Sequence, residues 1–379
     1  MATLYAGLMS GTSLDGVDGV LVDFATGSPV VLHHIYQSFD ASFAAELLAL
    51  NSPADNEIHR GALAANTLAR SYADVVLALL QVAGCVAADV AAIGAHGQTV
   101  RHRPQEFDGC GYTVQLNNPA LLAELTGIDV VADFRSRDVA AGGQGAPLVP
   151  AFHQDVFARS DATVAVVNIG GFSNLTLLPP AACIDRPADE GKVLGFDCGP
   201  GNALMDYWCL RHTGQPFDRD GAWSHAGMVD EKLLDRLLAE PYLARTPPKS
   251  TGRDLFNPAW LNQRLSAVGS DATPADVQAT LCEFTARVCA NDLQRQAPDS
   301  NLLIVCGGGA RNHALMRRLQ ARLPGVRVES SDAHGLPALQ VEAAAFAWLA
   351  RRALQHETGS LQSVTGARGA RILGAIYPR

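Results

Sequence analysis

The sequence predicts an α/β fold built in two similar halves, because segments of strand character alternate with segments of helical periodicity along its 379 residues. Each half opens on two apolar strands joined by a turn of small residues, at 10–13 and 168–174. Each half later carries an apolar strand that runs into a glycine-containing turn, at 93–97 and 305–309. This outline indicates a weak internal duplication, with a cleft between the two α/β layers.

The first half reads as a pair of strands followed by helices and then further strands. Apolar runs of β character predict the strands, and segments rich in Ala and Leu with a 3.6-residue period predict the helices. Residues 140–147 are rich in glycine and form a candidate hinge. The expected strands are 4–9, 17–24, 90–95, 113–116 and 128–132, and the expected helices are 41–50, 61–83, 119–126 and 150–157.

The second half repeats this outline. We expect domain I at residues 1–135, with the C-terminal segment 340–379 packing back toward it, and domain II at residues 136–339. The expected strands are 162–169, 175–178, 194–196, 301–306 and 326–329, and the expected helices are 273–296, 311–323 and 340–355.

Composition excludes several classes of function. The net charge is −9, and no run of Lys and Arg is interleaved with aromatic residues, which argues against nucleic acid or an anionic membrane as the partner. No apolar run approaches the ~18 residues of a spanning helix, and the start lacks the plan of a signal peptide. None of the eight cysteines forms a CxxC pair, so we expect a cytoplasmic protein without a zinc site.

The first turn, Ser10-Gly11-Thr12-Ser13, carries the groups of a phosphate site. It offers backbone N–H groups and hydroxyls to an anion, and its glycine lets the backbone come close. Asp15 and Asp18 follow directly, and their carboxylates can hold a divalent cation, directly or through water. The alternative interpretation is an ordinary hairpin turn.

Two further glycine turns are candidate nucleotide sites. Gly170-Gly171 would face the first turn across the cleft and hold the β- and γ-phosphates from the other side. Taken alone these glycines favour an ordinary hairpin, but the pairing of the two turns favours the phosphate site. Gly307-Gly308-Gly309, between a strand and a helix, would let adenine and ribose lie against the backbone. Neither GxGxxG nor GxxxxGK[ST] occurs, which disfavours dinucleotide-dependent dehydrogenases and P-loop ATPases.

Asp197 follows a short apolar strand and precedes Gly199 and Gly201. A carboxylate placed by a strand, with close approach of the backbone permitted, suits a general base. A carboxylate that caps the turn is the alternative.

Polar side chains also follow other strands. His96, Gln98 and Arg135 offer donors to a polar substrate, and Arg135 can bind a carboxylate through two N–H groups. The alternative for Arg135 is a pair with Asp133. Glu342 begins an Ala-rich helix, either as a partner of the helix dipole or as a residue of the cleft.

In their order and spacing these motifs resemble those of the anhydro-N-acetylmuramic acid kinases, a branch of the acetate and sugar kinase, heat-shock protein and actin superfamily. The resemblance runs essentially from end to end of the chain. It is carried by the helix that contains Glu342 and by residues 9–18, 96–99, 133–135, 140–147, 168–174, 195–202, 248–253 and 306–312.

The resemblance implies two ribonuclease-H-like (actin-like ATPase) domains with a nucleotide cleft between them. It implies a kinase that uses ATP and Mg²⁺, opens 1,6-anhydro-N-acetylmuramic acid with water and phosphorylates O6, giving N-acetylmuramic acid 6-phosphate and ADP in peptidoglycan recycling. It also implies a homodimer and Asp197 as the catalytic base. By the family pattern the ATP phosphates and Mg²⁺ bind Gly11, Thr12, Ser13, Leu14, Asp15, Gly16, Val17 and Asp18.

Two alternatives stay open. A sugar kinase of the same superfamily would act on a free hydroxyl without opening an anhydro ring, and an ATP-dependent binding module would not turn over a sugar at all. Cys198 stands where the family pattern usually has Thr, so its thiol is expected to alter the hydrogen bonding beside Asp197.

Overall fold

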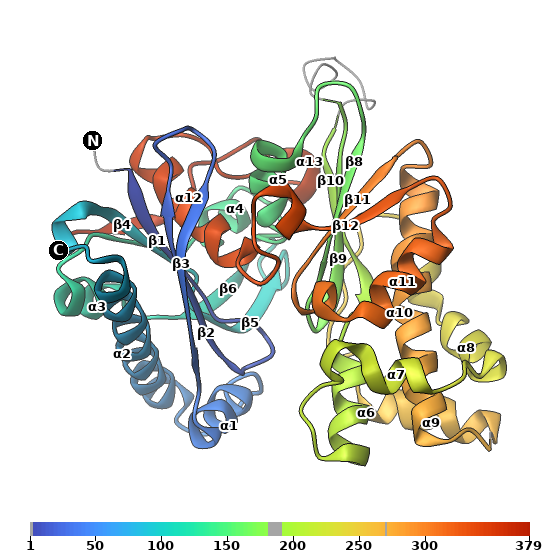
Figure 1. Ribbon diagram of the computed structural model, residues 1–379. Coiled ribbons are helices and arrows are strands. Elements are labelled where there is room, and N and C mark those ends of the chain that lie inside the picture. Colours follow the sequence, from blue (N-terminus) through green and yellow to red (C-terminus); the bar gives the residue numbers. More distant parts are fainter. Residues whose placement is uncertain (1–2, 181–191, 270) are drawn as a thin grey trace. The chain divides into compact units, whose positions relative to one another are not determined.

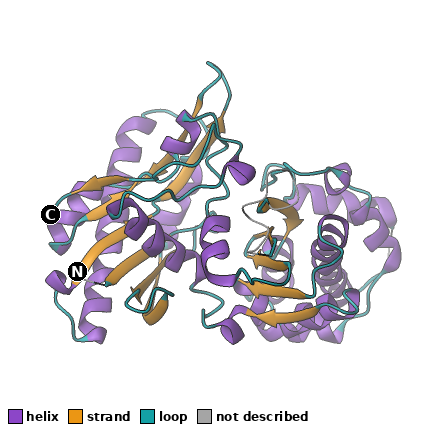
Figure 2. Cartoon of the chain, turned by 90° about the horizontal axis from the view of Figure 1, so that it is seen from above, coloured by secondary structure: helices purple, strands orange, loops and turns teal. Residues whose placement is uncertain are grey.

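The protein is described by a computed structural model at residues 3–180, 192–269 and 271–379 (Figure 1). The chain forms two compact units, one of Met1–Val156 with Gln340–Arg379 and the other of Phe157–Leu339. Each unit contains one main mixed sheet, and helices flank both sheets (Figure 2). The α/β fold expected from the sequence is therefore confirmed.

The boundary between the units lies 21 residues beyond the one expected at 135/136, because residues 136–156 lie in the first unit. Hydrogen bonds to the C-terminal segment hold them there. The Asp138 carboxylate accepts from Thr365 Oγ1 at 2.8 Å, and Gln144 N donates to the Thr365 carbonyl at 2.8 Å. Asp138 also accepts from Gly145 N at 2.8 Å, which fixes the glycine-rich loop.

The sheet of the first unit has the order β13-β7-β4-β1-β2-β3. Its antiparallel half is the hairpin β1–β2 with the adjoining strand β3, and β4 and β7 add parallel strands. The sequence did not indicate β3 or β13, because their exposed positions break the apolar pattern. The strands are β1 Leu4–Met9, β2 Gly16–Asp23, β3 Val30–Ser38, β4 Val90–Ala95, β7 Val130–Ala132 and β13 Ala375–Tyr377, and a separate hairpin is β5 Gln98–Pro104 with β6 Gly111–Leu116.

Two helices cover opposite faces of this sheet. The helix α2 (Glu57–Ala83) packs on the face of Leu8, and α12 (Val341–Leu354) packs on the face of Gly7. Since successive strand residues point to opposite faces, Gly7 faces α12 and Leu8 faces α2. The other helices of the unit are α1 Ala41–Ala49, α3 Pro119–Thr126, α4 Ser136–Ala140, α5 Val149–Phe157, which ends at the boundary, and α13 Gln362–Thr365.

The contact of α12 with the sheet depends on glycine. Gly7 and Gly94 are register partners on β1 and β4. A Cβ at Gly94 would lie 2.0 Å from the Phe346 carbonyl oxygen, and one at Gly7 would lie 1.9 Å from that of Ala343. The helix backbone therefore lies directly on the strands, which the Ala-rich sequence of α12 permits.

Gly94→Ala is expected to lower the free energy of unfolding by about 3 kcal/mol, since α12 must move off the sheet to admit the methyl group. Denaturant unfolding measures the change. The control is Gly61→Ala in α2, where the nearest atom to the new methyl is Leu116 Cδ2 at 3.6 Å. That variant is expected to be neutral or stabilised by up to about 1 kcal/mol, and equal losses in both variants would contradict the packing argument.

The sheet of the second unit has the order β10-β9-β8-β11-β12. Three antiparallel strands are again extended by parallel ones, which matches β3-β2-β1-β4-β7 of the first unit and confirms the duplication seen in the sequence. β10 does not end at residue 196 as expected but continues through Asp197, past a register shift. The strands are β8 Val164–Ile169, β9 Phe172–Leu178, β10 Leu194–Pro200, β11 Leu302–Cys306 and β12 Arg327–Ser330.

Helix α10 (Pro274–Gln296) runs through the core of the second unit and is buried along most of its length. A capping box of Thr273 and Asp276 begins it, with Pro274 at its first position. The remaining helices are α6 Ala203–Thr213, α7 Ala222–Ala226, α8 Glu231–Leu238, α9 Pro258–Val268 and α11 His313–Arg322, with short 3₁₀ turns at Arg219–Gly221, Pro241–Ala244, Gly308–Arg311 and Ser331–His334.

Among the described residues, α2 is the one helix whose length and composition would allow it to cross a membrane, with a mean hydropathy of 1.2. Its most apolar stretch is 56% buried inside the fold, against the sheet of the first unit. The core helix of a globular domain has the same character, so this feature is weak evidence for a span.

Candidate functional site

The first turn, between β1 and β2, is tied to the turn after β4 by a buried network. Ser10 Oγ donates to the Gly97 carbonyl at 3.2 Å, and the Tyr72 hydroxyl lies 3.0 Å from Ser10 Oγ. Gly97 N donates to the same hydroxyl at 3.1 Å. Burial raises the pKa of Tyr72, so this phenol stays protonated. Sequence patterns did not single out Tyr72, since it lies within an apolar helix far from both turns.

Gln98 belongs to the same network. Its Nε2 donates to the Gly11 carbonyl at 3.1 Å and its side chain is fully buried. The amide predicted to bind the sugar therefore holds the first turn in place. Its Oε1 has no hydrogen-bond partner among the described residues.

The residues predicted to bind the ATP phosphates divide into two groups. Thr12, Ser13 and Asp15 are exposed on the turn, whereas Val17 lies fully inside the core. Position 16 must be glycine because β3 packs against it: a Cβ there would lie 2.4 Å from the Gln37 carbonyl oxygen. The Val17 side chain and the space beside Gly16 are therefore closed to a ligand, whereas the Asp18 side chain is 37% exposed.

The two predicted metal-binding carboxylates already have partners. Asp15 Oδ1 accepts from Ser13 Oγ at 2.5 Å, and Asp18 Oδ1 lies 2.9 Å from His34 Nε2. In the described part of the chain no group of three or more His, Cys, Asp or Glu side chains is arranged to hold a metal ion.

His96 and Arg135 lie together in the first unit, and the charge of Glu342 acts on Arg135. Arg135 donates to His96 Nε2 from Nε at 3.1 Å and from Nη2 at 2.9 Å, and to the Gly145 carbonyl from Nη1 at 2.7 Å. Arg135 therefore does not pair with Asp133, whose carboxylate accepts from Ser136 at 2.5 Å.

Burial sets the charge states in this cluster. Desolvation, and then the charge of Arg135, hold the pKa of His96 well below its usual value, so His96 is neutral and its Nε2 can accept. Burial lowers the pKa of Arg135 to about 10, against the opposing effects of Glu342 and Asp138. The guanidinium therefore keeps its charge at neutral pH.

In the second unit, the 247–251 segment holds Asp197. Its carboxylate oxygen Oδ2 accepts from Ser250 Oγ at 2.8 Å and from Thr251 N at 3.1 Å. Burial raises the pKa of Asp197, and these two hydrogen bonds and the Lys249 charge only partly offset it. The result is a carboxylate more basic than an ordinary Asp, which suits a general base.

Cys198 does not contact the Asp197 carboxylate, contrary to expectation. Its thiol is buried close to Cys289, with the Lys249–Asp292 pair nearby, and burial raises its pKa well above the usual value.

The turn at Gly170-Gly171 caps helix α6. The Gly170 carbonyl accepts from Asn202 N at 2.7 Å, and that of Gly171 accepts from Ala203 N at 3.0 Å. A Cβ at either glycine would meet its nearest atom only at 3.8 Å. Packing inside the unit does not require glycine here, whereas a ligand close to the backbone would.

Packing explains two of the three glycines at 307–309. Gly307 has a φ of +77°, and a Cβ there would lie 2.3 Å from Asn168 Oδ1. A Cβ at Gly309 would lie 2.5 Å from Ile169 Cβ. Gly308 has more room, with Asn202 Nδ2 at 3.3 Å, so it is the residue of this turn whose missing side chain the fold explains least.

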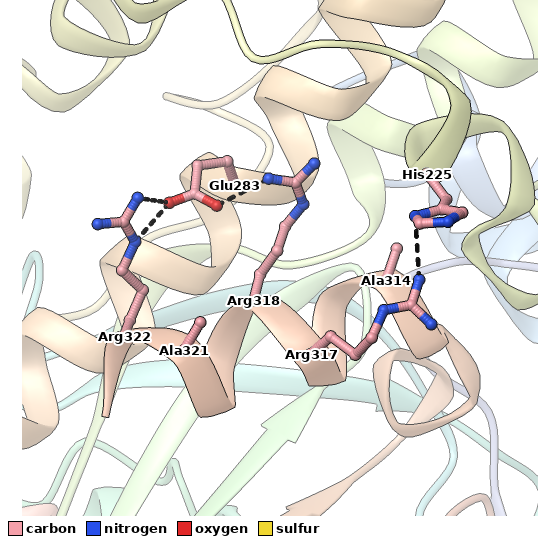
Figure 3. Close-up of a pocket in the computed structure, with 7 residues that line it drawn as sticks. All are labelled: His225, Glu283, Ala314, Arg317, Arg318, Ala321 and Arg322. Carbon is pink, nitrogen blue, oxygen red and sulfur yellow. Dashed lines mark hydrogen bonds and ion pairs between the residues drawn. The ribbon is translucent and has the colours of Figure 1, made fainter. Parts of the chain in front are cut away.

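A cavity of about 430 Å³ in the second unit contains none of the predicted site residues (Figure 3). Glu283 projects from α10 and binds Arg287, Arg318 and Arg322, at 3.0, 2.9 and 2.6 Å. Burial raises the pKa of Glu283, but these arginines lower it more. Arg318 and Arg322 of the lining thus join α11 to α10, whereas Arg317 Nη2 lies 3.2 Å from His225 Nδ1 on α7. The lining residues are His225, Glu283, Ala314, Arg317, Arg318, Ala321 and Arg322.

Comparison with known proteins gives matches over the full chain. Residues 3–379 match the family model described as anhydro-N-acetylmuramic acid kinase. The chain is 67% identical to the anhydro-N-acetylmuramic acid kinase of Variovorax paradoxus (strain S110), over 99% of each chain. It is 64% identical to that of Albidiferax ferrireducens, over 100% of each.

Among solved structures, the activator of the 2-hydroxyisocaproyl-CoA dehydratase from Clostridium difficile with bound ADPNP is 12% identical, with a TM-score of 0.49. The match covers 93% of this chain and 96% of that one. This likeness is too low to carry an argument about ligands.

Proposed function

The chain belongs to the anhydro-N-acetylmuramic acid kinase family, and we propose that Asp197 is the catalytic base of its reaction. The protein is a kinase that converts 1,6-anhydro-N-acetylmuramic acid, ATP and water to N-acetylmuramic acid 6-phosphate and ADP, in peptidoglycan recycling. The observation that carries the proposal is the Asp197 carboxylate, held through one oxygen by Ser250 and Thr251.

In this reaction Asp197 takes a proton from the water whose oxygen attacks C1 of the sugar. The C1–O6 bond breaks, and O6 keeps the electron pair and attacks the γ-phosphorus. The bond from the γ-phosphorus to the bridging oxygen breaks, and ADP leaves. The raised pKa of Asp197 makes it a better proton acceptor at this step.

Residues 11–18 and Gly170-Gly171 are the proposed sites of the ATP phosphates, and 307–309 that of adenosine. The exposed hydroxyls of Thr12 and Ser13 and the open space at Gly170 and Gly171 support this assignment. Phosphoryl transfer depends mostly on positioning and charge stabilisation, which such turns supply. The nucleotide cleft between the two units stays a prediction.

His96, Arg135 and Glu342, with Gln98, are the proposed contacts of the sugar. A charged guanidinium suits the lactyl carboxylate, and the carboxylate of Glu342 suits sugar hydroxyls. For Gln98 only Oε1 is available to the sugar, because Nε2 binds Gly11.

Asp15 and Asp18 would hold Mg²⁺. In nucleotide sites this ion takes one or two carboxylates together with phosphate oxygens and water, and two carboxylates on one hairpin fit that donor set. The ion would neutralise charge on the phosphates. Asp18 would have to share or release His34.

A homodimer and a cytoplasmic location are further parts of the proposal. Both come from the family resemblance and the composition, and light scattering of the purified protein tests the first.

Coupled ADP release tests the substrate. We expect turnover with 1,6-anhydro-N-acetylmuramic acid and ATP, and none with glucose or free N-acetylmuramic acid. With H₂¹⁸O, the label is expected at the anomeric hydroxyl of the product at early times, after correction for anomer exchange. Turnover of free sugars, without label beyond exchange, would instead favour a sugar kinase that acts on a free hydroxyl.

A further inference from the structure

The 247–251 segment contacts Asp197 at three points, two on the side chain and one on the backbone. Besides the two donors to Oδ2, the Lys249 carbonyl accepts from Asp197 N at 3.2 Å. Tyr242 adds a fourth contact from outside the segment, since its hydroxyl donates to the Asp197 carbonyl at 2.7 Å. Among the described residues none donates a hydrogen bond to Oδ1.

A buried ion pair fixes this segment. Lys249 Nζ lies 2.9 Å and 3.1 Å from the two carboxylate oxygens of Asp292 on α10, and the two side chains are only 1% and 2% exposed. The ammonium also lies 5.5 Å from the ring of Phe196 and 5.3 Å from that of Tyr242. Lys249 thus joins the segment to the helix that forms the centre of the unit.

Such a pair is weak evidence for stability. Removing two charges from water costs free energy that their attraction only partly returns, and apolar residues often serve as well. The mechanism proposed above gives neither Lys249 nor Asp292 a contact with substrate. Their position directly behind the segment that holds Asp197 points to a different role.

We propose that Lys249 is a positioning residue for Asp197: its ion pair with Asp292 fixes the 247–251 segment, which in turn aims the Asp197 carboxylate. The inference rests on the proposed role of Asp197 as the base. One carboxylate oxygen is held by Ser250 and Thr251, and the other is left to take the proton from water.

The Lys249 cation also acts on Asp197 through its charge. It favours the ionised carboxylate and so lowers the pKa that burial raises. The ionisable groups near the Lys249 ammonium are Asp292, Cys289 and Arg295 on α10, Cys198 on β10, and Tyr242. Arg295 donates to Asp292 Oδ1 at 2.5 Å.

The test is the double variant Lys249→Met with Asp292→Asn, which removes both charges and leaves neither one buried alone. We expect kcat to fall about 10- to 100-fold with KM for ATP unchanged, as misplacement of a reacting group does. The acidic limb of kcat/KM should move to higher pH, because the ionised form of Asp197 loses a neighbouring cation. The matched control is Lys232→Met with Asp235→Asn on the exposed face of α8, which should leave both quantities unchanged.

A folded double variant with wild-type kcat and an unmoved acidic limb would overturn the inference. If the double variant shows no cooperative thermal transition, Ser250→Ala, at an exposed position of the segment, replaces it as the test. Wild-type kcat with an unmoved acidic limb in Ser250→Ala would then overturn the inference. Wild-type activity in Asp197→Asn would refute the base itself. Loss of activity in Asp197→Asn with an unchanged double variant would refute the positioning role alone.

Discussion

Asp197→Asn is expected to lower kcat about 10³-fold while ATP binding and the fold are kept. General base catalysis contributes about 10² to 10⁴ in rate, and an amide cannot accept the proton from the attacking water. The amide oxygen can still accept from Ser250 and Thr251, so the local structure stays. Steady-state kinetics and nucleotide titration measure the two effects.

Stability gives an independent check on this variant. Burial raises the pKa of Asp197 above its value in the unfolded chain, so the folded state binds the proton more tightly. The free energy of unfolding therefore falls as pH rises from the unfolded pKa through the folded pKa, because the ionised carboxylate is buried. At neutral pH the variant should therefore unfold at the same temperature as the wild type or above it. The pH profile of the residual kcat/KM should also lose its acidic limb.

The control for this pair of measurements is Asp235→Asn, at an exposed position of α8. It should leave kcat and the melting temperature unchanged. Near wild-type kcat in Asp197→Asn would contradict the assignment of the base.

Arg135→Ala is expected to raise KM for the muramic acid substrate about 10²-fold and to leave KM for ATP close to that of the wild type. A charged hydrogen bond contributes up to about 3 kcal/mol, and the guanidinium is the cation of the proposed sugar site. Initial-rate kinetics with each substrate varied in turn give the two constants.

Arg135 also has structural contacts, so the design needs two comparisons. Its removal leaves His96 Nε2 and the Gly145 carbonyl without these donors, and thermal unfolding must show that the variant is folded. Arg137→Ala, at an exposed position two residues on, is the matched control and should change neither KM. Equal increases in both constants in Arg135→Ala would mean that this arginine is structural only.

The candidate site was partly predictable from the sequence. Turns, strand ends and glycines are local signals, so residues 10–18, Gly170-Gly171, Asp197 and Arg135 could be found from their neighbours alone. Ser250 and Thr251 could not be found in this way, because Asp197, to which they donate hydrogen bonds, lies more than 50 residues away in the sequence. Residues 248–253 contributed to the family resemblance, but the sequence indicated no functional role for them.

Glycine shows the limit of sequence patterns most clearly. Gly7 and Gly94 look like weak points of two strands, yet each lets α12 lie on the sheet. Gly307 and Gly309 looked like a nucleotide site, and packing against Asn168 and Ile169 already requires them. Composition cannot separate a glycine that admits a helix from one that admits a ligand, because both need a missing side chain.

The α/β character, the internal duplication, the family and the kinase activity could all be inferred from the amino-acid sequence, since periodicity and ordered motifs are properties of the chain alone. Three features became visible only in the folded chain: the residues that support Asp197, the hydrogen bond from Gln98 to the Gly11 carbonyl, and the unit to which residues 136–156 belong. The reason is physical: a hydrogen bond or a buried ion pair forms between groups that folding brings together. Lys249 and Asp292 are 43 positions apart, and nothing in the sequence indicates their contact.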